Sequence, residues 1–184
     1  MKRVGFQLKL SLFFISALTL ILIVTTYFVY QKAIIQQKEN LRVRILDLVK
    51  LSSMLIDGDK LVQIKPEMES QNTLVYKEIK TILTKIKTTD PIIDDVYTMV
   101  KSNMENVLLF LVDAGDKKNI IAYCGERYDV TSIPRIKEAF IRPAVDDQPI
   151  ADKWGIWLSG YAPVYNRDDK VVAIVGLDVS AEAI

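Results

Sequence analysis

The chain begins with a long apolar stretch. From Leu10 to Tyr30, over 21 residues, no side chain is charged. An α-helix of this length spans about 31 Å, which matches a bilayer core of roughly 30 Å. Lys2, Arg3 and Lys9 precede the stretch, and positive side chains favour the cytoplasmic side of a membrane. The pattern predicts a transmembrane helix with a cytoplasmic N-terminus, followed by an extracytoplasmic part.

We therefore divide the chain into residues 1–30, a cytoplasmic N-terminus and transmembrane helix, and residues 31–184, one extracytoplasmic domain. A cleaved signal peptide is one alternative, but its apolar segment would be shorter, and no small-residue cleavage motif follows Val24. A pilin-like anchor is another. Gly5-Phe6 resembles a prepilin cleavage junction, but Leu10 stands where that family has a glutamate. An uncleaved, single-pass anchor in a bacterial cytoplasmic (inner) membrane fits the pattern better.

Helical periodicity continues from Gln31 to Ile56. Apolar residues recur there every seven positions, at Ile34, Leu41, Leu48 and Leu55. Such a stripe is either the seam of a parallel homodimer or the face of a helix that packs on a sheet. Asp57-Gly58-Asp59 ends the helix, and we expect Gly58 to supply a left-handed turn.

A second amphipathic helix is predicted from Leu74 to Lys87. Its apolar face consists of Val75, Ile79, Ile82, Leu83 and Ile86. Asn72 or Thr73 can cap its N-terminus. Pro91 follows shortly after it, and the residue before a proline is biased away from the helical conformation.

Alternating and β-branched patterns replace the helical ones after Asp94. They predict five strands, at 96–101, 107–113, 120–124, 156–165 and 170–179. Polar turn residues at 102–106 and 166–169 join the first two and the last two strands into hairpins. Pro163 lacks an amide donor and marks a bulge or an edge contact.

Residues 125–129 are expected to form a loop, followed by a short helix that ends near Ile141 and a polar excursion over 142–152. The predicted fold is α+β. The transmembrane helix continues into a long helix, and a five-stranded antiparallel sheet flanked by helices follows. With helices on one face of the sheet, the excursion covers the other face only in part. A small-molecule pocket would form on that half-covered face.

The amino-acid composition excludes several classes of function. A net charge of +1 and a hydrophobic fraction of 50% argue against a disordered chain and against a nucleic-acid partner. The chain has no histidine, which excludes Ser-His-Asp and Cys-His catalysis and histidine-based metal motifs. The lone Cys124 cannot form an internal disulfide. Because no phosphate-binding loop or nucleophile elbow is present either, we expect no enzyme activity, no cofactor and no metal site.

The candidate ligand-binding residues lie on the strands expected to face the pocket. They are Tyr97, Met99, Trp154, Trp157, Ser159, Tyr161 and Asp178. Aromatic side chains with one carboxylate can orient a polar or cationic ligand. The alternative is that the aromatic residues only pack the sheet. Phe110 joins the set if it faces the same way, and Arg127, Arg142 or Lys153 can hold a carboxylate if one reaches the cleft.

The closing hairpin carries a resemblance. The pattern A-P-V-Y, a polar turn, then K-V-V-A-I-V-G-L-D-V, resembles the last hairpin of Cache-type (PDC) domains, the PAS-like extracytoplasmic sensors of bacterial receptors. In amino-acid-sensing members the aspartate of this segment helps hold the ligand's ammonium, and Asp178 is the matching position. Those members also carry an R-x-W-Y signature, where this chain has only Lys153-Trp154. The resemblance therefore implies a PAS-like sensor but does not support an amino-acid ligand.

These observations predict the ligand-sensing domain of a bacterial transmembrane receptor. The domain would bind a small molecule, form a parallel dimer in the lipid bilayer, and pass the signal to a cytoplasmic output module that follows a second membrane helix. We expect the chain to be a fragment of such a receptor, ending where that helix begins. The alternative is a bitopic membrane scaffold whose globular part binds another protein.

Overall fold

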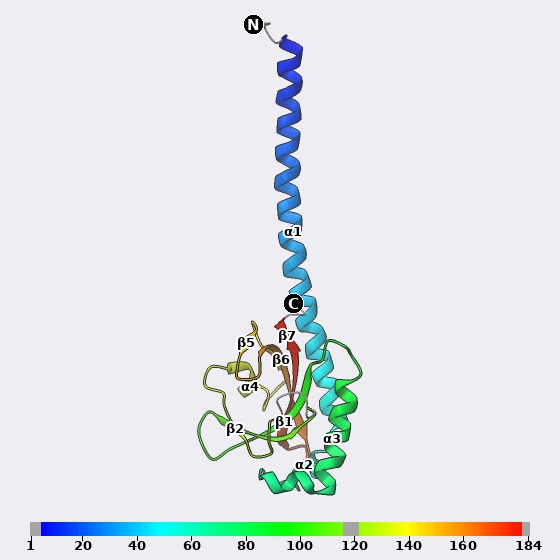
Figure 1. Ribbon diagram of the computed structural model, residues 1–184, viewed down its shortest axis with the longest axis vertical. Coiled ribbons are helices and arrows are strands. Elements are labelled where there is room, and N and C mark those ends of the chain that lie inside the picture. The colour runs from blue at the N-terminus through cyan, green and yellow to red at the C-terminus, as the bar shows by residue number, and fades with distance from the viewer. Residues whose placement is uncertain (1–4, 116–121, 182–184) are drawn as a thin grey trace. The chain divides into compact units, whose positions relative to one another are not determined.

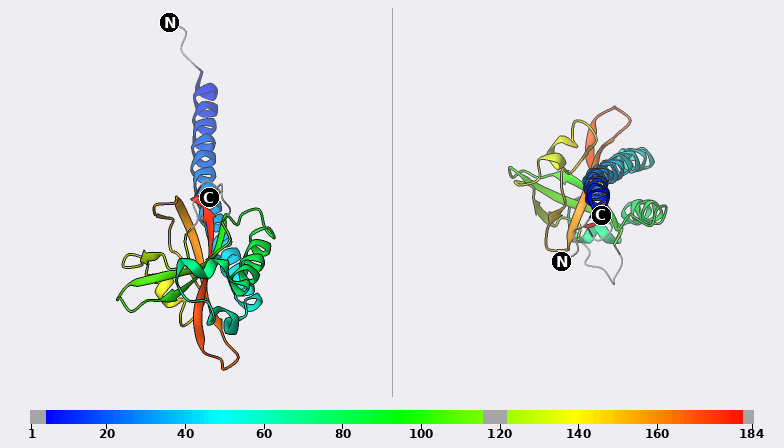
Figure 2. Two further views of the ribbon diagram at one scale, coloured as in Figure 1. Left: turned by 60° about the horizontal axis from the view of Figure 1, so that its bottom comes forward. Right: turned by 90° about the horizontal axis from the view of Figure 1, so that it is seen from above.

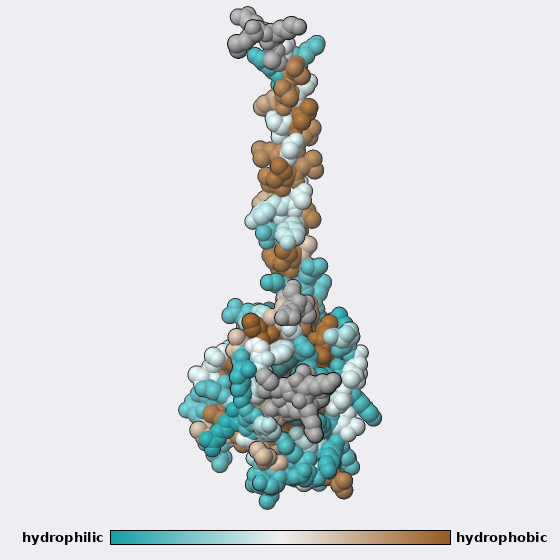
Figure 3. All heavy atoms as spheres, in the orientation of Figure 1, coloured by the Kyte–Doolittle hydropathy of each residue, from teal (hydrophilic) through white to brown (hydrophobic). Residues whose placement is uncertain are grey.

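The computed structural model describes residues 5–115 and 122–181. Internal contacts divide the chain into residues 1–41 and residues 42–184. The helix α1 (Phe6–Leu55) makes up the described part of the first unit and contributes residues 42–55 to the second. Within the described ranges, α1 is the one helix that is long and apolar enough to cross a membrane. Its apolar stretch is exposed, as the brown spheres along the helix in Figure 3 show. The boundary at residue 30 stays a prediction.

The second unit is built on one antiparallel sheet. Its strands are β1 (Asp95–Lys101), β2 (Val107–Asp113), β3 (Arg127–Asp129), β4 (Ala144–Val145), β5 (Ile150–Ala151), β6 (Ile156–Tyr165) and β7 (Val171–Ser180). They lie in the order β3-β2-β1-β7-β6-β4, and β5 also pairs with β6. The two long strands of the closing hairpin are therefore central, and β7 is paired on both sides along Ile174 to Asp178.

Helices cover one face of the sheet. The C-terminal part of α1 and α3 (Leu74–Lys87) lie on this face in Figures 1 and 2. The Thr73 hydroxyl accepts a hydrogen bond from the Tyr76 amide and caps α3, whose buried side chains are Tyr76, Ile79, Leu83 and Ile86. A Cβ added at Gly160 would lie 2.5 Å from Ile45 Cγ2, so α1 packs almost directly on the backbone of β6. The buried side chains of α1 are Ile45, Val49 and Ser52, whereas Leu55 of the predicted stripe is exposed, so the packed face lies beside that stripe.

The opposite face carries a second apolar cluster. The short helix α4 (Pro134–Glu138) places Ile136 against β1, β2, β6 and β7, where it packs with Met99, Phe110, Tyr161 and Ile174. The excursion is thus anchored on the sheet, as predicted, although it pairs there through β4 and β5 rather than lying as an irregular loop.

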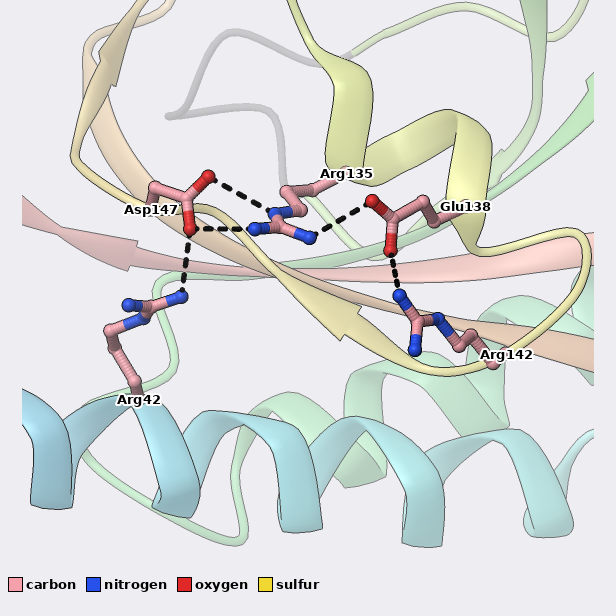
Figure 4. A network of polar contacts seen from close by, with 5 residues as sticks. All are labelled: Arg42, Arg135, Glu138, Arg142 and Asp147. Carbon is pink, nitrogen blue, oxygen red and sulfur yellow. Dashed lines mark hydrogen bonds and ion pairs between the residues drawn. The ribbon is translucent and has the colours of Figure 1, made fainter.

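Five charged residues link the excursion to α1 at the β4 edge of the sheet (Figure 4). Arg135 donates two hydrogen bonds to the Asp147 carboxylate, of 3.1 and 2.9 Å. Arg42 of α1 forms an ion pair with the same carboxylate at 3.2 Å. Glu138 accepts from Arg135 and Arg142, each at 2.9 Å. The bidentate Arg135–Asp147 pair orients α4 relative to the loop after β4, and the single Arg42–Asp147 contact joins that loop to α1.

The α+β class and the antiparallel sheet flanked by helices are confirmed, but the third strand was predicted at the wrong place. Residues 122–124 are not a strand, and residues 120 and 121 lie outside the described residues. The strand is β3, at residues expected to form a loop. Gly125 turns the chain at φ 86°, which lets Arg127–Asp129 pair with β2. Strands of two or three residues depend on their partner strand and have no periodicity of their own.

The prediction of a left-handed turn at Gly58 was also wrong. The Asp57 side chain caps a further short helix, α2 (Gly58–Leu61), which precedes a 3₁₀ helix, η1 (Met68–Asn72). Gly58 is required for another reason, since an added Cβ would lie 2.3 Å from the Tyr165 carbonyl oxygen. The close approach holds the turn after α1 against the end of β6. Pro163, where a bulge or an edge contact was expected, pairs regularly with Ile174. The register shift between β6 and β7 lies one residue further on, at Val164/Tyr165.

We expect Gly58→Ala to lower the free energy of unfolding by about 1–3 kcal/mol, because the methyl group meets backbone atoms that cannot rotate away. Urea denaturation of the full chain in detergent micelles measures this. Gly5→Ala is the matched control, since nothing lies within 4 Å of an added Cβ there. Equal midpoints for the two variants would contradict the close approach.

Candidate functional site

Cross-strand pairing places polar residues in one row on the excursion-covered face of the sheet. Asp95 of β1 lies opposite Asp178 of β7, and Asp178 lies opposite Ser159 of β6. In the next row, Tyr97 lies opposite Gly176. Because directly opposite residues point to the same side of a sheet, Asp95 and Asp178 are neighbouring carboxylates.

Gly176 determines how Tyr97 lies on this face. An added Cβ would sit 2.3–2.8 Å from three atoms of the Tyr97 side chain, so that the ring occupies the space a side chain would fill. From this position the Tyr97 hydroxyl donates a 3.0 Å hydrogen bond to Asp178 Oδ1. The spacing of glycine and aspartate in G-L-D-V therefore has a physical reason: the glycine admits the tyrosine that binds the aspartate.

A cavity of about 260 Å³ opens beside this pair. Its aromatic lining consists of Tyr97, Phe110, Tyr128, Trp154 and Trp157. Its acidic lining consists of Asp94, Asp95, Asp113, Asp152 and Asp178, and Lys87 completes the lining residues. The rings of Tyr97, Tyr128 and Trp154 lie around Phe110 in edge-to-face contacts, with centroids 5.3–5.7 Å apart. The lining of the cavity therefore combines aromatic rings with carboxyl groups.

The structure brings four of the seven predicted site residues to this cavity, namely Tyr97, Trp154, Trp157 and Asp178, together with Phe110. Met99 and Tyr161 instead belong to the apolar cluster under α4, and both are buried. Ser159 is buried as well, and its hydroxyl supports Asp178 by a hydrogen bond. Ligand contact by any of the seven stays a prediction.

Asp152, at the turn between β5 and β6, was not predicted as a site residue. Its Oδ1 accepts from the Trp154 and Gly155 amides at 2.8 and 3.1 Å and from the Trp157 indole at 3.3 Å. Its Oδ2 accepts from the Tyr128 hydroxyl at 3.1 Å. One carboxylate thus positions the Tyr128 and Trp157 side chains and the backbone at Trp154. An aspartate two residues before a tryptophan in a turn-rich segment was the available sequence signal.

Asp95 and Asp113 were also missed, because each stands at the end of a predicted strand. Asp113 is buried, and its two oxygens accept from the Gly115 and Ala122 amides. Burial, reinforced by repulsion from Asp95, raises the pKa of Asp113 to about 7. Burial also raises the pKa of Asp95, although Lys87 lies 3.3 Å away and acts in the opposite direction.

Asp178 has the least favourable position for a negative charge. Burial raises the pKa of Asp178 to about 8, and repulsion from Asp95 and Asp152 contributes to the rise. Hydrogen bonds from Ser159 and Tyr97 act in the opposite direction without cancelling it. A cation in the cavity would relieve this strain, because an opposite charge nearby favours the ionised form.

The cations suggested from the sequence lie elsewhere. Arg142 pairs with Glu138, and Lys153 pairs with Glu126 while its ammonium sits 4.3 Å from the centroid of the Trp154 ring. Arg127 is exposed and does not line the cavity. Within residues 5–115 and 122–181, no three Cys, Asp or Glu side chains are grouped so as to hold a metal ion.

The ligand-free protein should lose stability through Asp178 as the pH rises. The folded state keeps this proton up to about pH 8, whereas the ordinary pKa is 3.8. Between these values the folded state binds more protons than the unfolded state, so the contribution of Asp178 to the free energy of unfolding falls with pH. Asp178→Asn removes that dependence. We expect the melting temperature of Asp178→Asn, relative to wild type, to rise from pH 5 to pH 8.

Asp168→Asn, an exposed change in the β6–β7 turn, is the control and should show no such trend. A difference between Asp178→Asn and wild type that stays constant from pH 5 to pH 8 would contradict the raised pKa.

Comparisons with known proteins identify the fold. No protein-family model and no curated protein matches the chain. Among solved structures, the periplasmic sensory domain of the Campylobacter jejuni chemoreceptor Tlp1 superposes with a TM-score of 0.52 at 11% identity. The alignment covers 83% of this chain and 58% of the Tlp1 domain, so the chain spans little more than half the length of that domain.

Two further matches are more distant. The ligand-binding domain of C. jejuni Tlp3 in complex with L-valine aligns over 79% of this chain and 62% of its own, with a TM-score of 0.43 at 14% identity. The ligand-binding domain of Pseudomonas aeruginosa PctC in complex with GABA aligns over 78% and 66%, with a TM-score of 0.38 at 15% identity. The chain therefore has the fold of a periplasmic sensory domain, and the resemblance to Cache-type sensors is confirmed at the level of the fold.

Proposed function

We propose that this chain is the extracytoplasmic sensor domain of a bacterial transmembrane receptor. The apolar stretch of α1 anchors it in the cytoplasmic membrane, and the cavity beside Asp178 binds a small molecule. The observation that carries the proposal is the cavity itself, where an aromatic lining meets a carboxylate whose negative charge is poorly compensated. Such a site gains stability when a ligand supplies a positive or hydrogen-bond-donating group.

Signal transmission follows from where the site lies in the sheet. Asp178 is two residues before the end of β7, so a ligand at Asp178 acts directly on this strand. β6, paired with β7 at this position, contacts α1 through Gly160 and Ile45. A ligand that binds better to one position of β7 shifts the population toward it, and a coupling of about 1–3 kcal/mol is ordinary for such switches.

The test is a thermal-shift screen of the full chain in detergent micelles against amines, amino acids, organic acids and purines. A ligand at one hundred times its dissociation constant should stabilise the fold by about 2.7 kcal/mol. We expect at least one compound to raise the melting temperature of wild type and of Asp168→Asn, but not of Asp178→Asn.

Two outcomes would count against the proposal. If no compound shifts wild type, the cavity is not a small-molecule site, and a protein-binding scaffold becomes the better account. If a compound shifts Asp178→Asn as much as wild type, the ligand binds elsewhere on the chain.

A further inference from the structure

Carboxyl groups outnumber cations in the lining of the cavity. Five aspartates and one lysine line it among the described residues. Asp95 lies beside both Asp178 and Asp113, whereas Asp152 accepts from Tyr128 and Trp157, and no three of the carboxylates are grouped as a metal site within the described ranges. A ligand that matches this arrangement carries its positive charge on an extended organic frame.

Three hydrogen-bond donors of the lining are already engaged. The Tyr97 hydroxyl donates to Asp178, and the Tyr128 hydroxyl and Trp157 indole donate to Asp152. These bonds leave carboxylate lone pairs, aromatic faces and the single Trp154 indole N–H as the groups that the aromatic and acidic lining offers to a ligand. Both kinds of group bind ammonium: oxygens accept its hydrogen bonds, and ring faces attract its charge.

A carboxylate on the ligand would find little to bind. Lys87, the one cation among the described lining residues, already donates to Asp95 at 3.3 Å. A ligand carboxylate would have to displace that bond. It would also lie beside Asp95 and Asp113, and like charges placed side by side in a partly desolvated site repel each other.

We propose that the cavity selects small organic amines that carry no carboxylate, and that it favours diamines over monoamines. The proposal rests on the proposed function and names the ligand class. The first ammonium binds at Asp178 and the aromatic lining. A second ammonium binds near Asp95 and Asp113, where it replaces part of the charge compensation that Lys87 supplies.

Three compounds of similar length separate the classes. 1,4-Diaminobutane carries two ammonium groups, butylamine carries one, and 4-aminobutanoate carries one ammonium and one carboxylate. Isothermal titration calorimetry of the full chain in uncharged detergent micelles measures each affinity. We expect 1,4-diaminobutane to bind more tightly than butylamine, and 4-aminobutanoate to bind at least roughly tenfold more weakly than butylamine, a difference of about 1.4 kcal/mol.

Lys87→Met sharpens the test, because an amino-acid ligand would need Lys87 to bind its carboxylate. We expect the variant to bind 1,4-diaminobutane several-fold more tightly, since a like charge leaves the cavity. Lys85→Met, an exposed change on the same helix, should leave every affinity unchanged. The inference is overturned if 4-aminobutanoate binds wild type as tightly as butylamine, if Lys87→Met weakens diamine binding, or if neither amine binds.

Failure of this inference can be told from failure of the proposed function. If neither amine binds but the screen finds an acid or amino acid whose effect is lost in Asp178→Asn, the sensor function stands and the ligand class is wrong. If the amines and every screened compound fail, both proposals fall.

Discussion

The Asp178 carboxylate is partly buried beside Asp95, Asp152 repels its negative charge, and hydrogen bonds from one tyrosine and one serine oppose the cost of that charge. Buried charges are expensive unless they are paired, so natural proteins keep them mainly where function requires it. Among the described residues, no positive side chain is bonded to Asp178. The nearby Lys87 donates its hydrogen bond to Asp95 instead. The local structure supports the aspartate without neutralising it, which leaves neutralisation to a proton or to a ligand.

Much of the surrounding geometry serves that position. Gly176 lets the Tyr97 ring lie over β7 and reach Asp178, and Asp152 holds Tyr128, Trp154 and Trp157 around the cavity. On the other face, Gly160 brings α1 against the backbone of β6. The sheet is thus thin between the cavity and the helix, with two glycines marking the points of close approach. A small displacement of β7 or β6 on one face therefore changes the packing of α1 on the other.

The sequence predicted the elements that carry their own periodicity. The bounds of α3 and of the long strands β1, β2, β6 and β7 were correct to within one residue, because apolar alternation and turn residues are local signals. The short strands β3, β4 and β5 were missed, since a strand of two or three residues is defined by its partner. Residues 122–124, predicted as the end of a strand, are not a strand.

The site residues were predictable only as far as local sequence patterns reveal them. Alternation placed Tyr97, Trp157 and Asp178 on one face, but it could not separate cavity lining from core, so Met99 and Tyr161 were grouped with them. Asp95 and Asp113 were missed because their proximity to Asp178 depends on strand register, a non-local property. The acidity of the cavity, on which the ligand class depends, became visible only in three dimensions.

Proton release on ligand binding tests the central claim most directly. Calorimetry of 1,4-diaminobutane binding at pH 7, in two buffers that differ in ionisation enthalpy, counts the protons that leave the protein. With the pKa of Asp178 at about 8 and that of Asp113 at about 7, an incoming cation should lower both and release protons. Asp178→Asn should release fewer protons, if it binds at all. Binding to wild type with no proton release, or with proton uptake, would contradict the account of a cavity whose strained carboxylates are neutralised by the ligand.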